Sequence, residues 1–491
     1  MRSFWRKAGL GLLLVVMIGV LAACTDTKKE SNEEPEKTED GKTVIKVVYK
    51  DDGPSVPAAV TYYDKLEVAL KEDLDLDIEF DIVEIAQGDY AEKLNILLYS
   101  GEIPDLIYFQ GGDQQIANQD LLEDLTPYIE KSKYIKDILQ PQNEARLANY
   151  PYLLWVKSID HKVPVVRKDF FDKMESSVAL KENPTVENYK EFFKELVEGD
   201  HVKNAVTVAG DISELNYIFN MAFGINQSWI ETDDGYVYSK VSDQEKEKLA
   251  YYKELYEEGL LDQQYLTKLW DTKEDAFYTG ETGVIVGTNG KVIDLYNNRI
   301  TSVNGEQAEL VILPPAKGEF QGFGATNTTK ESRGLAISSQ SPNKEVVFEI
   351  LDYLASPAGQ LLDRLGYEGE HYEIVDNEIV LNDTYYGDWW ARFWEPVNLD
   401  VDMSVSEDTP MLSAPAAESQ SLASSYYTED NAFIIPEENI PQWDAIENLY
   451  KEYSADIITG KKPLDAFDEF VEEWYANGGD ALTKIANESI K

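Results

Sequence analysis

Val44-Ile45-Lys46-Val47-Val48-Tyr49 is the first of three short runs that predict the strands of one sheet. The second is Leu76-Asp77-Ile78-Glu79-Phe80-Asp81-Ile82, whose strict alternation predicts a half-exposed strand, and the third is Pro104-Asp105-Leu106-Ile107-Tyr108-Phe109. Residues 62–74 and 90–99, which lie between these runs, carry apolar side chains at helical spacing. Strands that alternate with helices in this way indicate an α/β fold with a mainly parallel sheet, whose ligand sites lie beyond the carboxyl ends of the strands.

A second α/β unit is predicted farther along the chain. Residues 151–170 form an extended, proline-bounded stretch that looks like a crossover, and helices are expected at about residues 186–198 and 244–258. The run Gly283-Val284-Ile285-Val286-Gly287 predicts a buried strand. Residues 310–337 are again extended and rich in glycine, which suits a return crossing. We therefore expect two lobes, and a chain of this length can supply a core for each.

Regular structure returns after the second extended stretch. Residues 343–355 predict a helix, and residues 463–477 predict another that places Leu464, Phe467, Phe470, Val471 and Trp474 on one face. Its first turn begins with Pro463, and Gly478-Gly479 follows as a stop signal. We expect this to be the terminal helix, with Trp474 in the core, where we also place Trp443.

The amino terminus has the features of a bacterial lipoprotein signal. Arg2, Arg6 and Lys7 precede an apolar run over residues 8–23, which ends in Leu21-Ala22-Ala23-Cys24. Cys24 is the only cysteine of the chain. Its place directly after Leu-Ala-Ala favours a thiol that receives a lipid, and the sixteen apolar residues before it fall short of the ~20 needed to span a bilayer. The sequence predicts a protein anchored through Cys24 to the outer face of the membrane of a Gram-positive bacterium.

The chain after Cys24 is strongly acidic and cannot form a disulfide. The net charge of the whole sequence is −48, which argues against nucleic acid as a main partner, because phosphates require a basic surface. Residues 25–42 contain almost no apolar side chains, which predicts a disordered tether between the anchor and the first strand.

Motifs for catalysis, metals and cofactors are weak. His161, His201 and His371 are scattered without zinc-site spacing, so no metal is expected. Gly322-Phe323-Gly324 lacks the third glycine of a dinucleotide motif, and no cofactor is expected. Carboxylate pairs that could hydrolyse glycosides can be chosen anywhere in so acidic a chain and are not evidence for an enzyme.

Several segments resemble the extracellular solute-binding proteins of ATP-driven importers, in particular the family that includes maltose-binding protein. The motifs are Glu92-Lys93-Leu94-Asn95-Ile96-Leu97-Leu98 with Gly101-Glu102-Ile103-Pro104-Asp105, then Val166-Arg167-Lys168-Asp169-Phe170-Phe171, Tyr256-Glu257-Glu258-Gly259-Leu260-Leu261, Phe277-Tyr278-Thr279-Gly280-Glu281-Thr282-Gly283 and Ile458-Thr459-Gly460-Lys461. Gly366-Tyr367-Glu368-Gly369-Glu370-His371-Tyr372 is similar to a motif of the large lipoproteins of Gram-positive bacteria. The motifs occur in the family's order and cover nearly the whole mature chain.

This resemblance implies a two-lobed fold of the periplasmic-binding-protein type, with a multi-stranded hinge and a ligand captured between the lobes as they close. The expected organisation is a signal peptide (1–23), a tether (24–42), lobe 1 (43–155), lobe 2 (156–320), a return segment in lobe 1 (321–400) and a last segment that completes lobe 2 and the hinge (401–491).

Aromatic and polar side chains are the candidates for holding a ligand. Sugar rings present flat C–H faces and hydroxyl edges, so a sugar site needs aromatic faces together with carboxylate, amide or guanidinium groups. Each tryptophan could equally pack in a core, each loop residue could serve a turn, and Arg167 could pair with one of the many acids. The candidates are Trp155, Asp113, Asn289, Arg167, Trp229, Trp270, Trp389, Trp390 and Trp394.

From these observations we expect a monomeric receptor that binds a carbohydrate, most plausibly an oligosaccharide, and delivers it to the permease subunits of an ATP-driven importer. A receptor for amino acids or peptides on the same fold and an exported glycan-degrading lipoprotein remain as alternatives, as does a lipoprotein that senses or scaffolds without an importer.

Overall fold

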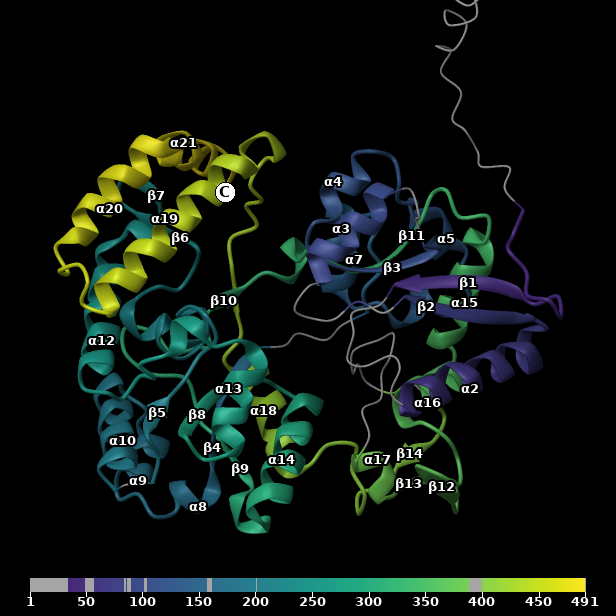
Figure 1. The fold of residues 1–491 in the computed structure, drawn as a ribbon, viewed down its shortest axis with the longest axis horizontal. Coiled ribbons are helices and arrows are strands. Elements are labelled where there is room, and N and C mark those ends of the chain that lie inside the picture. The colour runs from purple at the N-terminus through teal and green to yellow at the C-terminus, as the bar shows by residue number, and fades with distance from the viewer. Residues whose placement is uncertain are drawn as a thin grey trace, which may run out of the picture.

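The computed structural model shows two α/β lobes that lie side by side and are joined by crossing segments (Figure 1). Lobe 1 surrounds the sheet that contains β1, and lobe 2 surrounds the sheet that contains β8. The structure describes residues 34–48, 57–83, 85, 90–100, 104–156, 161–199, 201–387, 399 and 401–490.

The sheet of lobe 1 confirms the strands predicted for it. β1 (Thr43–Val48) lies between β2 (Ile78–Val83) and β3 (Leu106–Gln110) and is parallel to both. β11 (Arg333–Ile337) arrives from the return crossing and pairs antiparallel with β3. The carboxyl end of β1 points towards lobe 2 (Figure 1), so the loops that follow the parallel strands lie on the side where the lobes meet.

The helices of lobe 1 form one hydrophobic core with this sheet. A small three-stranded sheet, β12 (Tyr372–Val375), β13 (Glu378–Leu381) and β14 (Ser404–Val405), extends the same core. The helices are α2 (Pro57–Leu74), α3 (Tyr90–Ser100), α4 (Asp113–Ala117), α5 (Thr126–Lys131), α6 (Ile135–Ile138), α7 (Pro141–Asn149), α15 (Lys344–Ala355), α16 (Pro357–Leu365) and α17 (Asp383–Gly387).

The sheet of lobe 2 is mixed, which corrects the expected mainly parallel arrangement. Its order is β5 (Asn204–Val206), β8 (Thr282–Thr288), β4 (Lys162–Arg167) and β9 (Leu310–Ile312). β5 and β8 are parallel, but β4 runs antiparallel to both β8 and β9. The sequence pattern of β4 was attributed to a crossover. Its apolar side chains are instead fully or almost fully buried, because the chain enters the sheet directly as a central strand.

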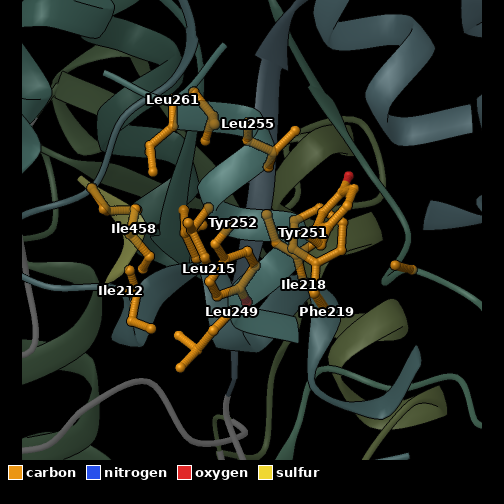
Figure 2. Packing of buried hydrophobic residues seen from close by; sticks show 14 of the residues in the cluster. Ile212, Leu215, Ile218, Phe219, Leu249, Tyr251, Tyr252, Leu255, Leu261 and Ile458 are labelled. Atoms are coloured by element: carbon orange, nitrogen blue, oxygen red, sulfur yellow. The ribbon is translucent and has the colours of Figure 1, made fainter. Parts of the chain in front are cut away.

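Buried aromatic and aliphatic side chains hold the helices of lobe 2 together. Figure 2 shows α11 (Ser213–Phe219) packed against α12 (Asp243–Glu257), with Phe219 in ring contact with Tyr251 and Tyr252 at 5.2 and 6.0 Å. Each such side chain contributes about 1.5–3 kcal/mol when it leaves water. The other elements are α8 (Lys168–Phe171), α9 (Ser176–Glu182), α10 (Val186–Glu198), β6 (Trp229–Thr232), β7 (Gly235–Tyr238), α13 (Trp270–Tyr278), α14 (Lys291–Asn304), α18 (Ala414–Ser425) and α19 (Ile440–Ile458).

The structure confirms most of the buried face of the predicted terminal helix, but the helix begins at Ala466 rather than in the turn of Pro463, and its predicted end is wrong. α20 (Ala466–Trp474) buries Phe467, Phe470 and Trp474, and Trp443 packs partly buried against the same core. A π-turn (Tyr475–Gly479) and a further helix, α21 (Asp480–Ser489), then follow. Gly478 adopts a φ of 118°, which L side chains rarely adopt. The glycine therefore redirects the chain between two helices instead of ending the last one.

The described end of the expected tether is ordered. The Thr38 N–H donates to Lys42 O at 3.0 Å, the Val44 N–H donates to Glu36 O at 2.9 Å, and Lys46 pairs with Glu36 at 2.8 Å. Residues 36–44 therefore form a hairpin at the start of β1, on the side of lobe 1 that faces away from lobe 2 (Figure 1). Its composition gave no sign of this because hydrogen bonds and an ion pair, rather than apolar burial, hold the turn.

The described chain passes between the lobes at three places. The first follows Val156, and its residues 157–160 lie outside the described part. The second runs through β10 (Ala325–Thr326) to β11, and the third runs from β14 to α18. After α18, β15 (Thr428–Glu429) pairs in parallel with β10, so two strands lie together at the hinge. Among the helices described, none has both the length and the apolar character to cross a membrane.

Candidate functional site

Asp113 connects the loop after β3 to two of the crossing segments. Gly111 and Gly112 take left-handed φ values of 84° and 77° in this loop, and Asp113 then begins α4. The fully buried Asp113 carboxylate accepts hydrogen bonds from the Tyr152 hydroxyl at 2.9 Å and from the Ser332 hydroxyl. Burial and this carboxylate raise the pKa of Tyr152 above its ordinary range. We call the region where the lobes meet the crossing segments the junction. The predicted site residue Asp113 holds this junction together in the structure.

Trp155 lies close to the first crossing, in the core of lobe 1. It is 2% exposed, and its ring centroid lies 5.5 Å from that of Tyr108 and 5.1 Å from the guanidinium of Arg333. Arg146 fixes this corner by donating hydrogen bonds to the carbonyl oxygens of Leu153 and of the Arg333 backbone. Burial lowers the pKa of Arg146 to about 10. Trp155 thus stands beside the junction with its ring covered.

Asn289 plays a comparable part in lobe 2. Its Oδ1 accepts from the His161 N–H at 3.1 Å, and its own N–H donates to His161 O at 3.2 Å. The next residue, Gly290, donates its N–H to the Ser419 hydroxyl of α18 at 2.8 Å. The loop after β8 therefore clamps the place where the first crossing enters lobe 2.

Aromatic rings from three segments surround the buried His161. Tyr427 follows α18, Phe323 precedes β10 and Tyr217 lies on α11, with ring centroids 5.5, 6.3 and 6.4 Å from the His161 ring. Phe323 is fully buried, whereas Tyr217 and Tyr427 are half-buried. This group brings aromatic side chains that are far apart in the sequence to the hinge end of lobe 2.

Trp270 begins α13 and lies under two lysines. Lys273 Nζ is 3.5 Å and Lys162 Nζ is 4.8 Å from its ring centroid. Both ammonium groups also contact Glu214 Oε1, at 2.6 and 3.5 Å. Burial lowers the pKa of Lys273, and Glu214 opposes that shift. Because Glu214 Oε1 contacts both Lys162 Nζ and Lys273 Nζ, the two ammonium groups cannot lie on opposite faces of the indole. The Lys162 side chain is 31% exposed beside the half-buried ring of Trp270.

The other candidates are placed elsewhere. Trp229 is 2% exposed and packs in the core of lobe 2 against Tyr238 and Phe433. Arg167 lies at the end of β4 away from the first crossing, where it forms a two-pronged ion pair with Asp169. Trp389, Trp390 and Trp394 lie outside the described residues. The ligand roles of all these residues stay predictions.

The sequence reasoning did not select four side chains of the junction. Lys162, Tyr217 and Tyr427 lie beside Trp270 or His161, and Arg333 lies over Trp155. Lys162 and Arg333 stand within a few residues of a crossing and Tyr427 directly precedes the hinge strand β15, which is a usable signal once these segments are known. Tyr217 carries no such signal, because α11 reaches the junction only through the tertiary fold.

Half-buried aromatic rings and partly exposed cations thus gather where lobe 2 meets the crossings. Such a set can stack against flat apolar faces and donate hydrogen bonds to hydroxyl or carboxylate oxygens. In the described part of the chain, no three His, Cys, Asp or Glu side chains are grouped as metal ligands would be.

A sequence profile described as "Bacterial extracellular solute-binding protein" matches residues 68–365, more than half of the chain. The chain belongs to this family of extracellular solute-binding proteins. The family consists of binding proteins rather than enzymes, which removes the glycan-degrading alternative. The binding protein is 20% identical to Lipoprotein LipO of Bacillus subtilis (strain 168), in an alignment that covers 99% of each chain.

Solved structures confirm the two-lobed α/β fold. The alginate-binding protein AlgQ2, in its form without calcium ion, has a TM-score of 0.65 and 13% identity, with 91% of this chain and 97% of that chain covered. The N-glycan transport solute-binding protein NgtS from Streptococcus pneumoniae has a TM-score of 0.64 and 18% identity, with 90% and 96% covered. NgtS has also been solved in complex with Man5GlcNAc. At these identities the likeness extends to the fold alone.

Proposed function

We propose that the binding protein is a receptor for an oligosaccharide, which it holds between its lobes and delivers unaltered to an ATP-driven importer. The observation that carries this proposal is the group of half-buried Trp270, Tyr217 and Tyr427 with the partly exposed Lys162 at the junction. Aromatic faces suit the C–H faces of sugar rings, and an ammonium group donates hydrogen bonds to their hydroxyl oxygens.

The similar folds of AlgQ2 and NgtS support a saccharide over an amino acid or peptide, since alginate and N-glycans are the ligands named for those two proteins. A lipid on Cys24 would keep the receptor beside its importer, and the likeness to Lipoprotein LipO supports such an anchor. Two acyl chains would be needed, because a single chain gives only marginal membrane binding.

Within this proposal the predicted site residues divide into three groups. Trp270 would touch the sugar together with Tyr217, Tyr427 and Lys162. Trp155, Asp113 and Asn289 would hold the crossings in place, and Trp389, Trp390 and Trp394 keep their predicted ligand role. Arg167 and Trp229, whose predicted ligand role is untested, would contribute to the packing of lobe 2.

A thermal-shift screen of the mature protein, extracted in detergent, tests the proposal. The screen uses neutral and acidic oligosaccharides, with amino acids and short peptides in parallel. A ligand that binds only the native state raises the melting temperature by mass action. We expect at least one oligosaccharide to do so, without new reducing ends appearing on incubation. A shift with peptides but with no oligosaccharide would overturn the carbohydrate assignment.

Two variants make the test specific for the junction. Trp270→Ala should remove most of the oligosaccharide-induced shift. Tyr256→Ala is the matched control, because Tyr256 is also a half-buried aromatic residue but lies near the carboxyl end of α12 and contacts Tyr265. Equal shifts in both variants would place the ligand away from Trp270.

A further inference from the structure

The lobes also touch away from the paired strands β10 and β15, at a contact between α14 and α17 that is separate from the hydrogen bond of Asn118 Nδ2 to Glu437 Oε1 at 2.6 Å. Lys291 starts α14 in lobe 2, and its Nζ lies 4.4 Å from the ring centroid of Tyr385 and 5.7 Å from that of Tyr386. Both tyrosines belong to α17, which packs with lobe 1. Figure 1 shows α14 and α17 facing one another on the side of the molecule away from the C-terminus.

Lys291 is an unusual contact because its charge is buried. The residue is 5% exposed, and its Nζ has no hydrogen-bond acceptor among the described residues. The Asp294 carboxylate lies 3.6 Å away, and burial lowers the pKa of Lys291. A cation in this position exchanges hydration for two aromatic faces and one carboxylate. Separation of the lobes would return this hydration to the Lys291 ammonium group.

Hydrogen bonds extend the contact along one face of α14. Asn298 donates from Nδ2 to the Tyr386 carbonyl at 2.6 Å, and Asp294 Oδ1 accepts from the Ser413 N–H at 3.1 Å. Residues 291, 294 and 298 share a helix face through their spacing of three and four.

The same tyrosines also hold the third crossing. The Tyr385 hydroxyl donates to Met411 O at 3.2 Å and the Tyr386 hydroxyl to Pro410 O at 2.7 Å. The helix α14, α17 and the crossing therefore meet in one polar contact.

We propose that this contact is a latch that limits how far the two lobes separate, with Lys291 as its central residue. The latch is made of Lys291, Asp294 and Asn298 on α14 and of Tyr385 and Tyr386 on α17. Lys291 comes two residues after Asn289, which clamps the first crossing. The latch therefore lies directly after the loop at the junction, and within this proposal it shifts the balance between open and closed lobes.

Distance measurements between the lobes test the latch without any ligand. In the full chain with Cys24→Ser no thiol remains, so Ile96→Cys on α3 and Val178→Cys on α9 accept one spin label each. These positions are 61% and 62% exposed. Double electron–electron resonance then gives the distribution of distances between the lobes.

Lys291→Met keeps an unbranched apolar side chain, one atom shorter, but removes its charge, and it should shift the distribution to longer and broader distances. Asn298→Ala removes one exposed hydrogen bond of the latch and should shift it in the same direction, which covers the case in which Lys291→Met fails to fold. Lys291→Arg retains the cation and should stay near the parent. Lys451→Met, an exposed lysine on α19, is the matched control. Parent-like distributions for both Lys291→Met and Asn298→Ala would overturn the proposal.

Discussion

Lys330 and Asp430 form an ion pair of 2.9 Å that joins the two strands of the hinge. Lys330 follows β10, and Asp430 follows β15. The Asp430 carboxylate, whose side chain is 6% exposed, also accepts from the N–H and the hydroxyl of Ser228 in lobe 2. The Lys330 carbonyl accepts from the Tyr150 hydroxyl of lobe 1 at 3.0 Å. Lys330 therefore bonds to lobe 1 through its carbonyl oxygen and is connected to lobe 2 through Asp430.

Lys330→Met should lower the free energy of unfolding by about 1–3 kcal/mol, because it removes a hydrogen bond to a mostly buried carboxylate. Ser228 keeps Asp430 partly satisfied, so the loss should not be larger. Urea denaturation at neutral pH measures it. Lys168→Met is the control, since Lys168 pairs with Asp172 at the surface and should change stability by less than about 0.5 kcal/mol. A loss no greater than that of the control would show that the hinge pair adds no stability.

Trp155→Ala should lower the free energy of unfolding by about 3–5 kcal/mol, as truncation of a buried tryptophan leaves a cavity. Trp270→Ala removes a half-buried side chain and should cost much less, while it weakens oligosaccharide binding. Urea denaturation and thermal shift, applied to both variants, separate the two roles. A small loss in Trp155→Ala together with lost binding would return Trp155 to the ligand site.

Glu67→Gln should stabilise the protein at neutral pH. Burial raises the pKa of Glu67 above 4.5, although the Phe80 N–H and Lys42 oppose this shift. The ionised carboxylate is therefore disfavoured in the folded state at pH values above the raised pKa. Below pH 4.5 Glu67 is protonated in both states, so the penalty disappears. The glutamine oxygen can still accept from Phe80.

The advantage of Glu67→Gln should consequently shrink as the pH falls from 7 towards 4.5. Denaturant titrations at several pH values follow it. Glu72→Gln is the matched control, because Glu72 is an exposed residue of the same helix. A pH-independent difference would mean that Glu67 is not the titrating group.

Cys24→Ser should move the protein from the membrane fraction to the medium or the soluble fraction, because no thiol then remains to receive a lipid. Ligand binding should be unchanged, since the junction residues lie in the lobes. Fractionation and thermal shift check both statements. Membrane retention of the variant would contradict the lipoprotein signal.

Local sequence patterns were sufficient for most helices and strands. The strands β1 and β3 are short apolar runs, and α10 occupies the predicted residues 186–198. The sequence prediction lacks helix α21, although Leu482, Ile485 and Ala486 have helical spacing, because the two glycines before them are a typical signal for the end of a helix.

Partners at the junction could not be predicted in the same way. Asp113 was chosen because it follows a strand, but its hydrogen bond to Ser332 connects residues that are 219 positions apart. No local pattern encodes such a pair. Arg167, by contrast, pairs with Asp169 two positions along the chain, and this close acid could have indicated a structural role from the sequence.

With a lipid on Cys24, the hairpin of residues 36–44 would determine which lobe is held near the membrane. Whatever its conformation, the chain from Cys24 to Glu34 spans at most ~36 Å, since each residue extends by no more than ~3.6 Å. The hairpin connects this segment to the outer end of lobe 1, away from lobe 2 (Figure 1). In this arrangement lobe 1 would stay fixed relative to the bilayer while lobe 2 moves relative to lobe 1. An importer would then meet one lobe at a nearly constant height above the bilayer.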